Sequence, residues 1–177
     1  LHRRRHSFPT RRSSDLLPAM PRYRQFSGNN AYVEGWALYT ESLGKDLGMY
    51  ADPNQWAGRL TGEMHRAIRL VVDTGMHWKN WSREKAIQYS KDNEPGDEAG
   101  IVSEIERYMV IPGQALSYKM GELKIRELKK KAKESLGEKY SDRDFHDQVL
   151  KEGALPLSIL DQRINRWINS QSQTKSK

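Results

Sequence analysis

The sequence predicts an all-α fold, a multi-helix array, on three observations. Apolar residues recur at helical spacing through most of the chain. Residues that favour helix starts, such as Ser, Asn and an Asp-Pro pair, stand directly before several of these segments. No segment alternates apolar and polar residues, and no Asn-Gly or Asp-Gly pair marks a hairpin, so nothing indicates a sheet.

The first predicted helix runs from Asn30 to about Leu47. Glu34 and Glu41 lie seven residues apart, so they share one side of it, within about 20°. The simplest interpretation of that side is a solvent-exposed surface. Gly35 favours a different interpretation. A glycine inside a helix costs about 1 kcal/mol of helix stability, and it is tolerated where another group must approach the backbone closely. The opposite side is an apolar stripe of Tyr32, Trp36, Tyr39, Leu43 and Leu47.

The next helices follow from their caps. Asp52 before Pro53 predicts the start of a long helix that ends near Gly75. Ser82 predicts the cap of a third helix, in REKAIQYSKD, and a fourth follows in EAGIVSEIERYMV. The Pro112-Gly113 pair predicts a break or sharp kink.

Three further segments complete the array. The fifth predicted helix is QALSYKMGELKIRELKKKAKESLG, whose Lys-rich second half is typical of a solvated face. Ser141 begins a capping box before FHDQVLKEG. Pro156 opens a last helix that continues through Trp167.

Charge and composition define the expected boundaries. Residues 1–16 hold five arginines and one aspartate, so removing them lowers the net charge from +7 to +3. The segment His6–Leu16 resembles the translation of a sequencing adapter, which predicts that 1–16 is an artefactual arm. The helical domain is then expected over 17–169, with a disordered tail over 170–177. Without the arm, little indicates a nucleic-acid partner, and no run is apolar enough for a membrane span.

The bulk composition indicates a part of something larger. Hydrophobic residues make up 36% of the 177 residues and charged residues 30%, with a mean hydropathy of −0.88. That is polar for a self-sufficient globule. The chain has no cysteine, which excludes disulfides and thiolate metal ligands.

Two further groups of residues could carry chemistry. Asp73 and His77 lie four residues apart and could share a helical turn, either to orient a ligand or as a helix-terminal hydrogen bond. Arg107, Tyr108 and Tyr118 surround the Pro-Gly break, and Tyr and Arg can stabilise an oxyanion. The alternative for this second group is a helix corner with amphipathic aromatic residues.

Four blocks together carry a resemblance to a known family. They are AYVEGWALYTESLGKDLGMYADP, GRLTGEMHRAIRLVVDTGMHWKNWSREKAI, EIERYMVIPGQALSYKMGELKIREL and DFHDQVLKEGALPLSIL. In this order they resemble the C-terminal portion of the bacterial domain of unknown function 885 family, from about Leu17 to about Trp167. Members of that family are similar to zincin-type metallopeptidases, which are largely helical.

The resemblance implies a zinc site. In such enzymes a His-Glu-x-x-Pro-Gly-His helix supplies two zinc-binding histidines and a glutamate base, and a later helix supplies a third ligand, a glutamate. Glu34 matches that ligand, and Glu41 would lie behind it and orient a ligand histidine. Tyr118, Tyr108, Arg107 and His77 would line the cleft for a peptide substrate, in oxyanion or substrate-binding roles.

This sequence departs from the family pattern because it contains no His-Glu-x-x-Pro-Gly-His motif. The simplest interpretation is an N-terminally truncated chain whose partner is the missing part of the same protein. As written, it is then expected to be inactive, since a zinc site needs three or four protein ligands. The alternatives are a helical binding or scaffold module of the same family and, less favoured, a small nucleic-acid-binding protein.

Overall fold

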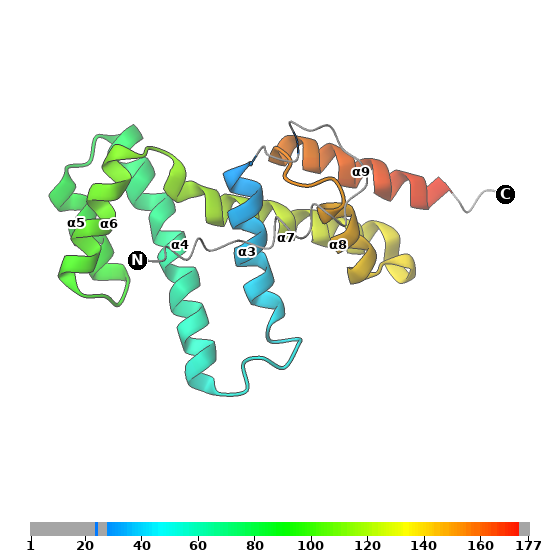
Figure 1. The fold of residues 1–177 in the computed structure, drawn as a ribbon, viewed down its shortest axis with the longest axis horizontal. Coiled ribbons are helices and arrows are strands. Elements are labelled where there is room, and N and C mark those ends of the chain that lie inside the picture. Colours follow the sequence, from blue (N-terminus) through cyan, green and yellow to red (C-terminus); the bar gives the residue numbers. More distant parts are fainter. Residues whose placement is uncertain (1–23, 25–27, 174–177) are drawn as a thin grey trace, which may run out of the picture. The chain divides into compact units, whose positions relative to one another are not determined.

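The computed structural model describes Arg24 and residues 28–173. All regular structure in this part of the chain is helical and no strand occurs in it, which confirms the all-α prediction. The described residues form two compact units (Figure 1). One comprises residues 30–126, and the other comprises residues 127–173 with Arg24 and residues 28–29.

The unit of residues 30–126 is built around a long helix, α4. Helices α5 and α6 pack against each other and against α4 (Figure 1). Helices α4, α5 and α6 enclose an apolar core, to which the short helix η1 contributes Ala115. The elements are α3 (Asn30–Leu43), α4 (Pro53–Lys79), α5 (Arg83–Asn93), α6 (Glu98–Val110), η1 (Gln114–Leu116) and the first half of α7 (Ser117–Leu136). The core residues are Ile68, Val72, Ala86, Ile87, Ile101, Ile105, Tyr108 and Ala115.

Local capping chemistry accounts for the helix starts. The Asp52 carboxylate accepts a hydrogen bond from the Asn54 amide at 2.9 Å, with Pro53 in the first turn. The Ser82 hydroxyl accepts one from the Lys85 amide at 3.2 Å. Both caps are as predicted, because each depends only on residues within one helical turn.

Two predicted helix ends were wrong. Helix α3 ends at Leu43 rather than near Leu47, which is 73% exposed and lies outside the core. Helix α4 passes Gly75 and ends at Lys79. Gly75 is required by packing instead, since an added Cβ would lie 2.5 Å from the Trp81 ring. The left-handed residue that ends α4 is Asn80, with φ 52°.

The second unit holds the C-terminal half of α7, η2 (Gly137–Lys139), α8 (Asp142–Leu150) and α9 (Leu157–Gln173). The Ser141 hydroxyl caps α8 by accepting from the Asp144 amide at 3.3 Å. Helix α9 includes residues 170–173 of the predicted tail. Residues 174–177 and the predicted arm 1–16 lie outside the described residues. The buried side chains include Leu128, Ala132, Leu136, Phe145, Val149, Leu155, Leu160, Ile164 and Ile168.

In the described part of the chain, no helix combines the length and the apolar character needed to cross a membrane.

Candidate functional site

Helices α3 and α7 meet at two glycines. A Cβ added to Gly35 would lie 2.4 Å from the Cα of Gly121, and one added to Gly121 would lie 1.8 Å from the carbonyl oxygen of Ala31. Real Cβ atoms do not approach other atoms so closely, so only glycine fits at both positions. The close backbone approach expected at Gly35 is therefore confirmed, and the approaching group is α7.

This crossing brings Glu34 to Tyr118. Glu34 is half-buried, and its carboxylate is near enough to the Tyr118 hydroxyl to act on its ionisation. Burial, followed by the charge and hydrogen bond of Glu34, raises the pKa of Tyr118, while Arg69 and Arg66 act in the opposite direction. The phenol therefore stays protonated at neutral pH and remains a hydrogen-bond donor.

Two arginines of α4 lie against the ring of Tyr118. The guanidinium carbon of Arg69 is 4.7 Å from the ring centroid and that of Arg66 is 5.6 Å from it. Arg69 is also 5.1 Å from the ring centroid of Tyr108, and its Nη2 donates to Gln114 Oε1 at 2.8 Å. Arg69 is only 5% exposed. It therefore links the two tyrosines that flank the Pro-Gly break.

Glu104 organises the residues on the other side of Arg69. The Tyr108 hydroxyl donates to Glu104 Oε2 at 2.6 Å, and Arg107 donates from Nη2 to the same oxygen at 2.7 Å and from Nε to Oε1 at 3.1 Å. Arg107 is the main cause that lowers the pKa of Glu104 to about 2, against a smaller opposing effect of burial. Burial and the bond to Glu104 raise the pKa of Tyr108. The structure thus pairs Arg107 and Tyr108 with a carboxylate that the sequence did not single out.

Asp73 and His77 do not bond to each other in the structure. The buried Asp73 carboxylate accepts the Gly113 amide, at 3.1 Å to Oδ2 and 3.2 Å to Oδ1. The Nε2 of His77 donates to the Tyr108 carbonyl at 3.0 Å. Both side chains of α4 therefore hold the 108–113 segment rather than each other.

Glu41 lies two turns after Glu34 on α3 and is half-buried. Its carbonyl oxygen accepts the Tyr50 hydroxyl at 2.9 Å, a contact that fixes the turn after the helix. The proposed role of its carboxylate behind a metal ligand stays a prediction.

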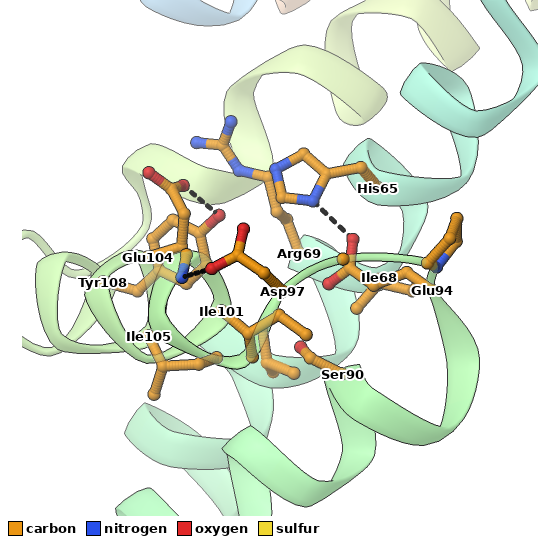
Figure 2. Close-up of a pocket in the computed structure, with 14 residues that line it drawn as sticks. His65, Ile68, Arg69, Ser90, Glu94, Asp97, Ile101, Glu104, Ile105 and Tyr108 are labelled. Atoms are coloured by element: carbon orange, nitrogen blue, oxygen red, sulfur yellow. Dashed lines mark hydrogen bonds and ion pairs between the residues drawn. The ribbon is translucent and has the colours of Figure 1, made fainter. Parts of the chain in front are cut away.

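A pocket of about 200 Å³ lies between α4, α5 and α6 (Figure 2). Arg69, Glu104 and Tyr108 line one part of it. In another part, His65 Nδ1 lies 2.6 Å from Glu94 Oε2. Ile68, Val72, Ile101 and Ile105 make its apolar walls, and Ser90, Pro95, Gly96, Asp97 and Gly100 complete the lining.

A series of ion pairs that includes a buried glutamate connects α4 to α7. Glu122 is 0% exposed, and its carboxylate lies 2.6 Å from the Lys119 ammonium and 2.6 Å from Arg126 Nε. Lys119 also contacts Glu63 at 2.6 Å, and Glu63 contacts Arg59 at 2.6 Å. These ion pairs fix the two helices beside the Glu34–Tyr118 contact.

Within residues 28–173 and Arg24, no three His, Cys, Asp or Glu side chains group closely enough to hold a metal ion. Glu34 is therefore one candidate ligand and not a site by itself.

Arg69, Glu104 and Glu122 were not among the residues predicted from the sequence. A signal existed for two of them, because each occupies a position of the apolar stripe. Arg69 stands beside the buried Ile68 and Val72, and Glu122 precedes the buried Ile125 by three residues. A charged residue on a buried stripe indicates a paired or functional group, since an isolated buried charge is costly.

Together these features define an all-α protein in which a carboxylate, a phenol and a buried guanidinium meet where α3, α4 and α7 come together. The chain belongs to the family of bacterial proteins of unknown function designated DUF885, which matches residues 12–164. No curated protein matches the chain.

Two solved structures resemble it. One, from Colwellia psychrerythraea, is 50% identical with a TM-score of 0.80, over 83% of this chain and 25% of that one. The other, from Shewanella oneidensis, is 24% identical with a TM-score of 0.77, over 86% of this chain and 28% of that one. Both are described as a "putative lipoprotein", the second also as of unknown function. The chain thus spans about a quarter of each structure's length.

Proposed function

We propose that this chain is the C-terminal portion of a zinc-dependent, metallopeptidase-like hydrolase, in which Glu34 supplies the third zinc ligand. The observation that supports it is the Glu34 carboxylate itself, half-buried beside the Gly35–Gly121 crossing with the Tyr118 hydroxyl on it. The resemblance of EGWALYTE to the ligand helix of zincin-type enzymes supplies the role.

In this proposal the chain supplies one zinc ligand, the Glu34 carboxylate. Carboxylate oxygens bind zinc, and a catalytic site uses three protein ligands. The two histidines and the catalytic base would come from a His-Glu-x-x-Pro-Gly-His helix in a longer protein, of which this chain would be a part. A bound zinc ion supplies a Lewis acid and a water whose pKa falls to about 7.

The residues of this chain would position the substrate and the ligand. Tyr118, still protonated at neutral pH, would donate its one hydroxyl proton either to the Glu34 carboxylate, to orient it, or to a developing oxyanion. Arg107 and Tyr108 are bonded to Glu104, and His77 holds the Tyr108 carbonyl. These three therefore support the cleft wall, and Glu41 would act behind the metal ligand. The substrate would be a peptide.

A non-catalytic helical binding module of the same family is the second candidate. An exposed apolar stripe along α4 favours it, since Leu60, Met64, Val71 and Trp78 follow at spacings of four and seven residues. Trp78 is 76% exposed. Such a stripe is typical of a surface that another helix covers.

The test begins with long-read sequencing across the codons for Arg5 to Pro21. If the frame continues upstream into a His-Glu-x-x-Pro-Gly-His helix, the encoded protein is expressed and its bound zinc and peptide hydrolysis are measured. We expect Glu34→Gln to lower zinc content by at least about tenfold and to abolish hydrolysis. The exposed Glu134→Gln serves as control. An encoded protein without the histidines, or one whose zinc content ignores Glu34→Gln, would favour the binding module.

A further inference from the structure

We infer that Arg66 and Arg69 form a binding site for a ligand carboxylate, one phenol ring away from Glu34. The inference deepens the proposed function, and it rests on that function only where it names the substrate as a peptide with a free carboxylate. The carboxylate site itself can be tested on this chain without zinc or activity.

The two arginines differ from the other arginines of their unit in their partners. Arg59 pairs with Glu63 at 2.6 Å, Arg126 with Glu122 at 2.6 Å and Arg107 with Glu104 at 2.7 Å. Within the described part of the chain, Arg66 and Arg69 hydrogen-bond to neutral oxygens, namely the Gly62 carbonyl at 2.9 Å and Gln114 Oε1 at 2.8 Å.

Their unused donors are buried. The Nε of Arg66 and the Nε of Arg69 are both shielded from solvent and have no acceptor among the described residues. Arg69 is 95% buried, since 5% of its surface is exposed. A buried guanidinium without a directly hydrogen-bonded carboxylate is costly, and the tyrosine rings offset only part of that cost. A ligand anion beside the two guanidinium groups would offset this cost.

The nearby carboxylates already have other partners: among the pocket residues, Glu94 lies 2.6 Å from His65 Nδ1, and Asp97 accepts the Gly100 amide at 2.8 Å. Arg69 is close enough to contribute to the low pKa of Glu104, but both Glu104 oxygens are already bonded by Arg107 and Tyr108. Glu34 acts on the Tyr118 hydroxyl and, in the proposed function, would bind metal.

The surroundings fit a carboxylate that carries an apolar group. The planar guanidinium fork matches a carboxylate with two parallel hydrogen bonds. Arg69 lines the pocket of about 200 Å³, whose walls include Ile68, Val72, Ile101 and Ile105 (Figure 2). An apolar side chain next to the carboxylate would enter this pocket. In a peptide substrate the carboxylate is either the C-terminus or an acidic side chain.

The test titrates the 177-residue chain with three peptides and follows the arginine Nε–H signals by NMR. The peptides are N-acetyl-Ala-Leu with a free C-terminus, the same peptide as its amide, and N-acetyl-Asp-Leu amide. We expect the free acid to shift the Nε–H signals of Arg66 and Arg69 and to bind at least about tenfold more tightly than its amide. Equal binding of all three peptides would overturn the inference. Tight binding of the Asp peptide would support a carboxylate site and assign it to acidic side chains.

Variants give the second measurement. Arg69→Lys and Arg66→Lys keep the charge but lose the fork, so each is expected to weaken binding of the free acid at least about tenfold. Arg83→Lys, on the surface and paired with Glu106, is the matched control and should bind as wild type. Wild-type affinity in both variants would overturn the inference. If Arg69→Lys does not fold, the carboxylate site is still tested by Arg66→Lys and by the comparison of the peptides on the wild-type chain.

The outcomes separate this inference from the proposed function. If this chain prefers the free acid, the carboxylate site is supported. If the longer protein then neither binds zinc nor hydrolyses peptides, the proposed peptidase function is overturned. Hydrolysis in the longer protein with equal rates on acid and amide substrates would support the peptidase and overturn the carboxylate site.

Discussion

Gly35 and Gly121 touch backbone to backbone where α3 crosses α7, because a Cβ on Gly35 would lie 2.4 Å from the Gly121 Cα. The contact fixes the neighbouring residues as well. Glu34 precedes Gly35 by one position and Tyr118 precedes Gly121 by three, which is how the carboxylate and the phenol meet. The geometry of the candidate site thus depends on two residues that have no side chain.

Replacing either glycine should destabilise the unit. Gly121→Ala would place a Cβ 1.8 Å from the Ala31 carbonyl oxygen, so the helices must separate. We expect a loss of about 2–3 kcal/mol in the free energy of unfolding, measured by urea denaturation, despite the roughly 1 kcal/mol that alanine gains in a helix.

Gly58 is the matched control for this prediction. It lies in α4, is exposed, and has no atom within 4 Å of an added Cβ. Gly58→Ala should therefore raise stability by about 0.5–1 kcal/mol. If Gly35→Ala, Gly121→Ala and Gly58→Ala all changed stability in the same direction and by similar amounts, the close crossing would not exist as described.

The glycines also show what sequence can and cannot predict here. That something approaches Gly35 follows from the cost of glycine in a helix, but the identity of Gly121 as the partner does not, since local pattern carries no information on distant contacts. The starts of α4 and α5 were predictable because Asp52 and Ser82 act within one turn. The end of α4 was not, because Gly75 makes room for Trp81 rather than ending the helix.

The candidate site, like the fold, has features that the sequence predicts and features that it does not. Glu34 and Tyr118 stand in blocks that resemble the family, so both could be singled out. The link between them through Arg69 could not, because stacking of one guanidinium on Tyr108 and Tyr118 depends on the tertiary fold.

Removing the buried charge of Glu122 should also destabilise the 30–126 unit. Glu122→Gln keeps the shape of the side chain but leaves Lys119 and Arg126 without their buried partner. Loss of one partner of a buried ion pair costs about 3–5 kcal/mol. Here about 2–3 kcal/mol is expected, because Lys119 keeps Glu63 and Arg126 is partly exposed.

Chemical denaturation of Glu122→Gln measures this loss. Glu134→Gln on the same helix is the control, since Glu134 is 66% exposed and 3.8 Å from Lys130, and it should change stability by less than about 0.5 kcal/mol. Equal effects of the two variants would contradict a structural role for the buried carboxylate.

Glu104 predicts a loss of stability in acid. The pKa of its carboxyl is lowered from 4.5 to about 2 in the folded protein, chiefly by the hydrogen bonds from Arg107. A lowered folded pKa means that the stabilisation is fully present above pH 4.5 and is lost as the pH falls toward 2. The side chain is 38% exposed, so solvent screening reduces the effect to about 1 kcal/mol.

Unfolding free energies at several pH values between 2 and 6 test this prediction. Wild type should lose about 1 kcal/mol more than Glu104→Gln between pH 4.5 and 2, because the variant lacks the titrating group. Tyr108→Phe removes one of the bonds to Glu104 and should fall between them. Parallel curves for wild type and Glu104→Gln would show that Glu104 does not contribute.

The contact between Glu34 and Tyr118 can be measured directly by titration. Burial is the largest cause that raises the pKa of Tyr118, and the charge and hydrogen bond of Glu34 add to it. Glu34→Gln removes the negative charge that opposes ionisation, so the pKa of Tyr118 should fall toward its ordinary value of 10.0 but stay above it. NMR of the tyrosine ring carbons, with Tyr118→Phe to assign the signal, gives this value.

Glu41→Gln provides the comparison on the same helix. Glu41 has the same charge as Glu34 and lies two turns further along α3, but it is not among the groups that act on Tyr118. Its removal should leave the Tyr118 titration unchanged. If both glutamine variants lowered the pKa of Tyr118 equally, a general charge effect would replace the specific contact, and Tyr118 would lose its proposed role in orienting the Glu34 carboxylate.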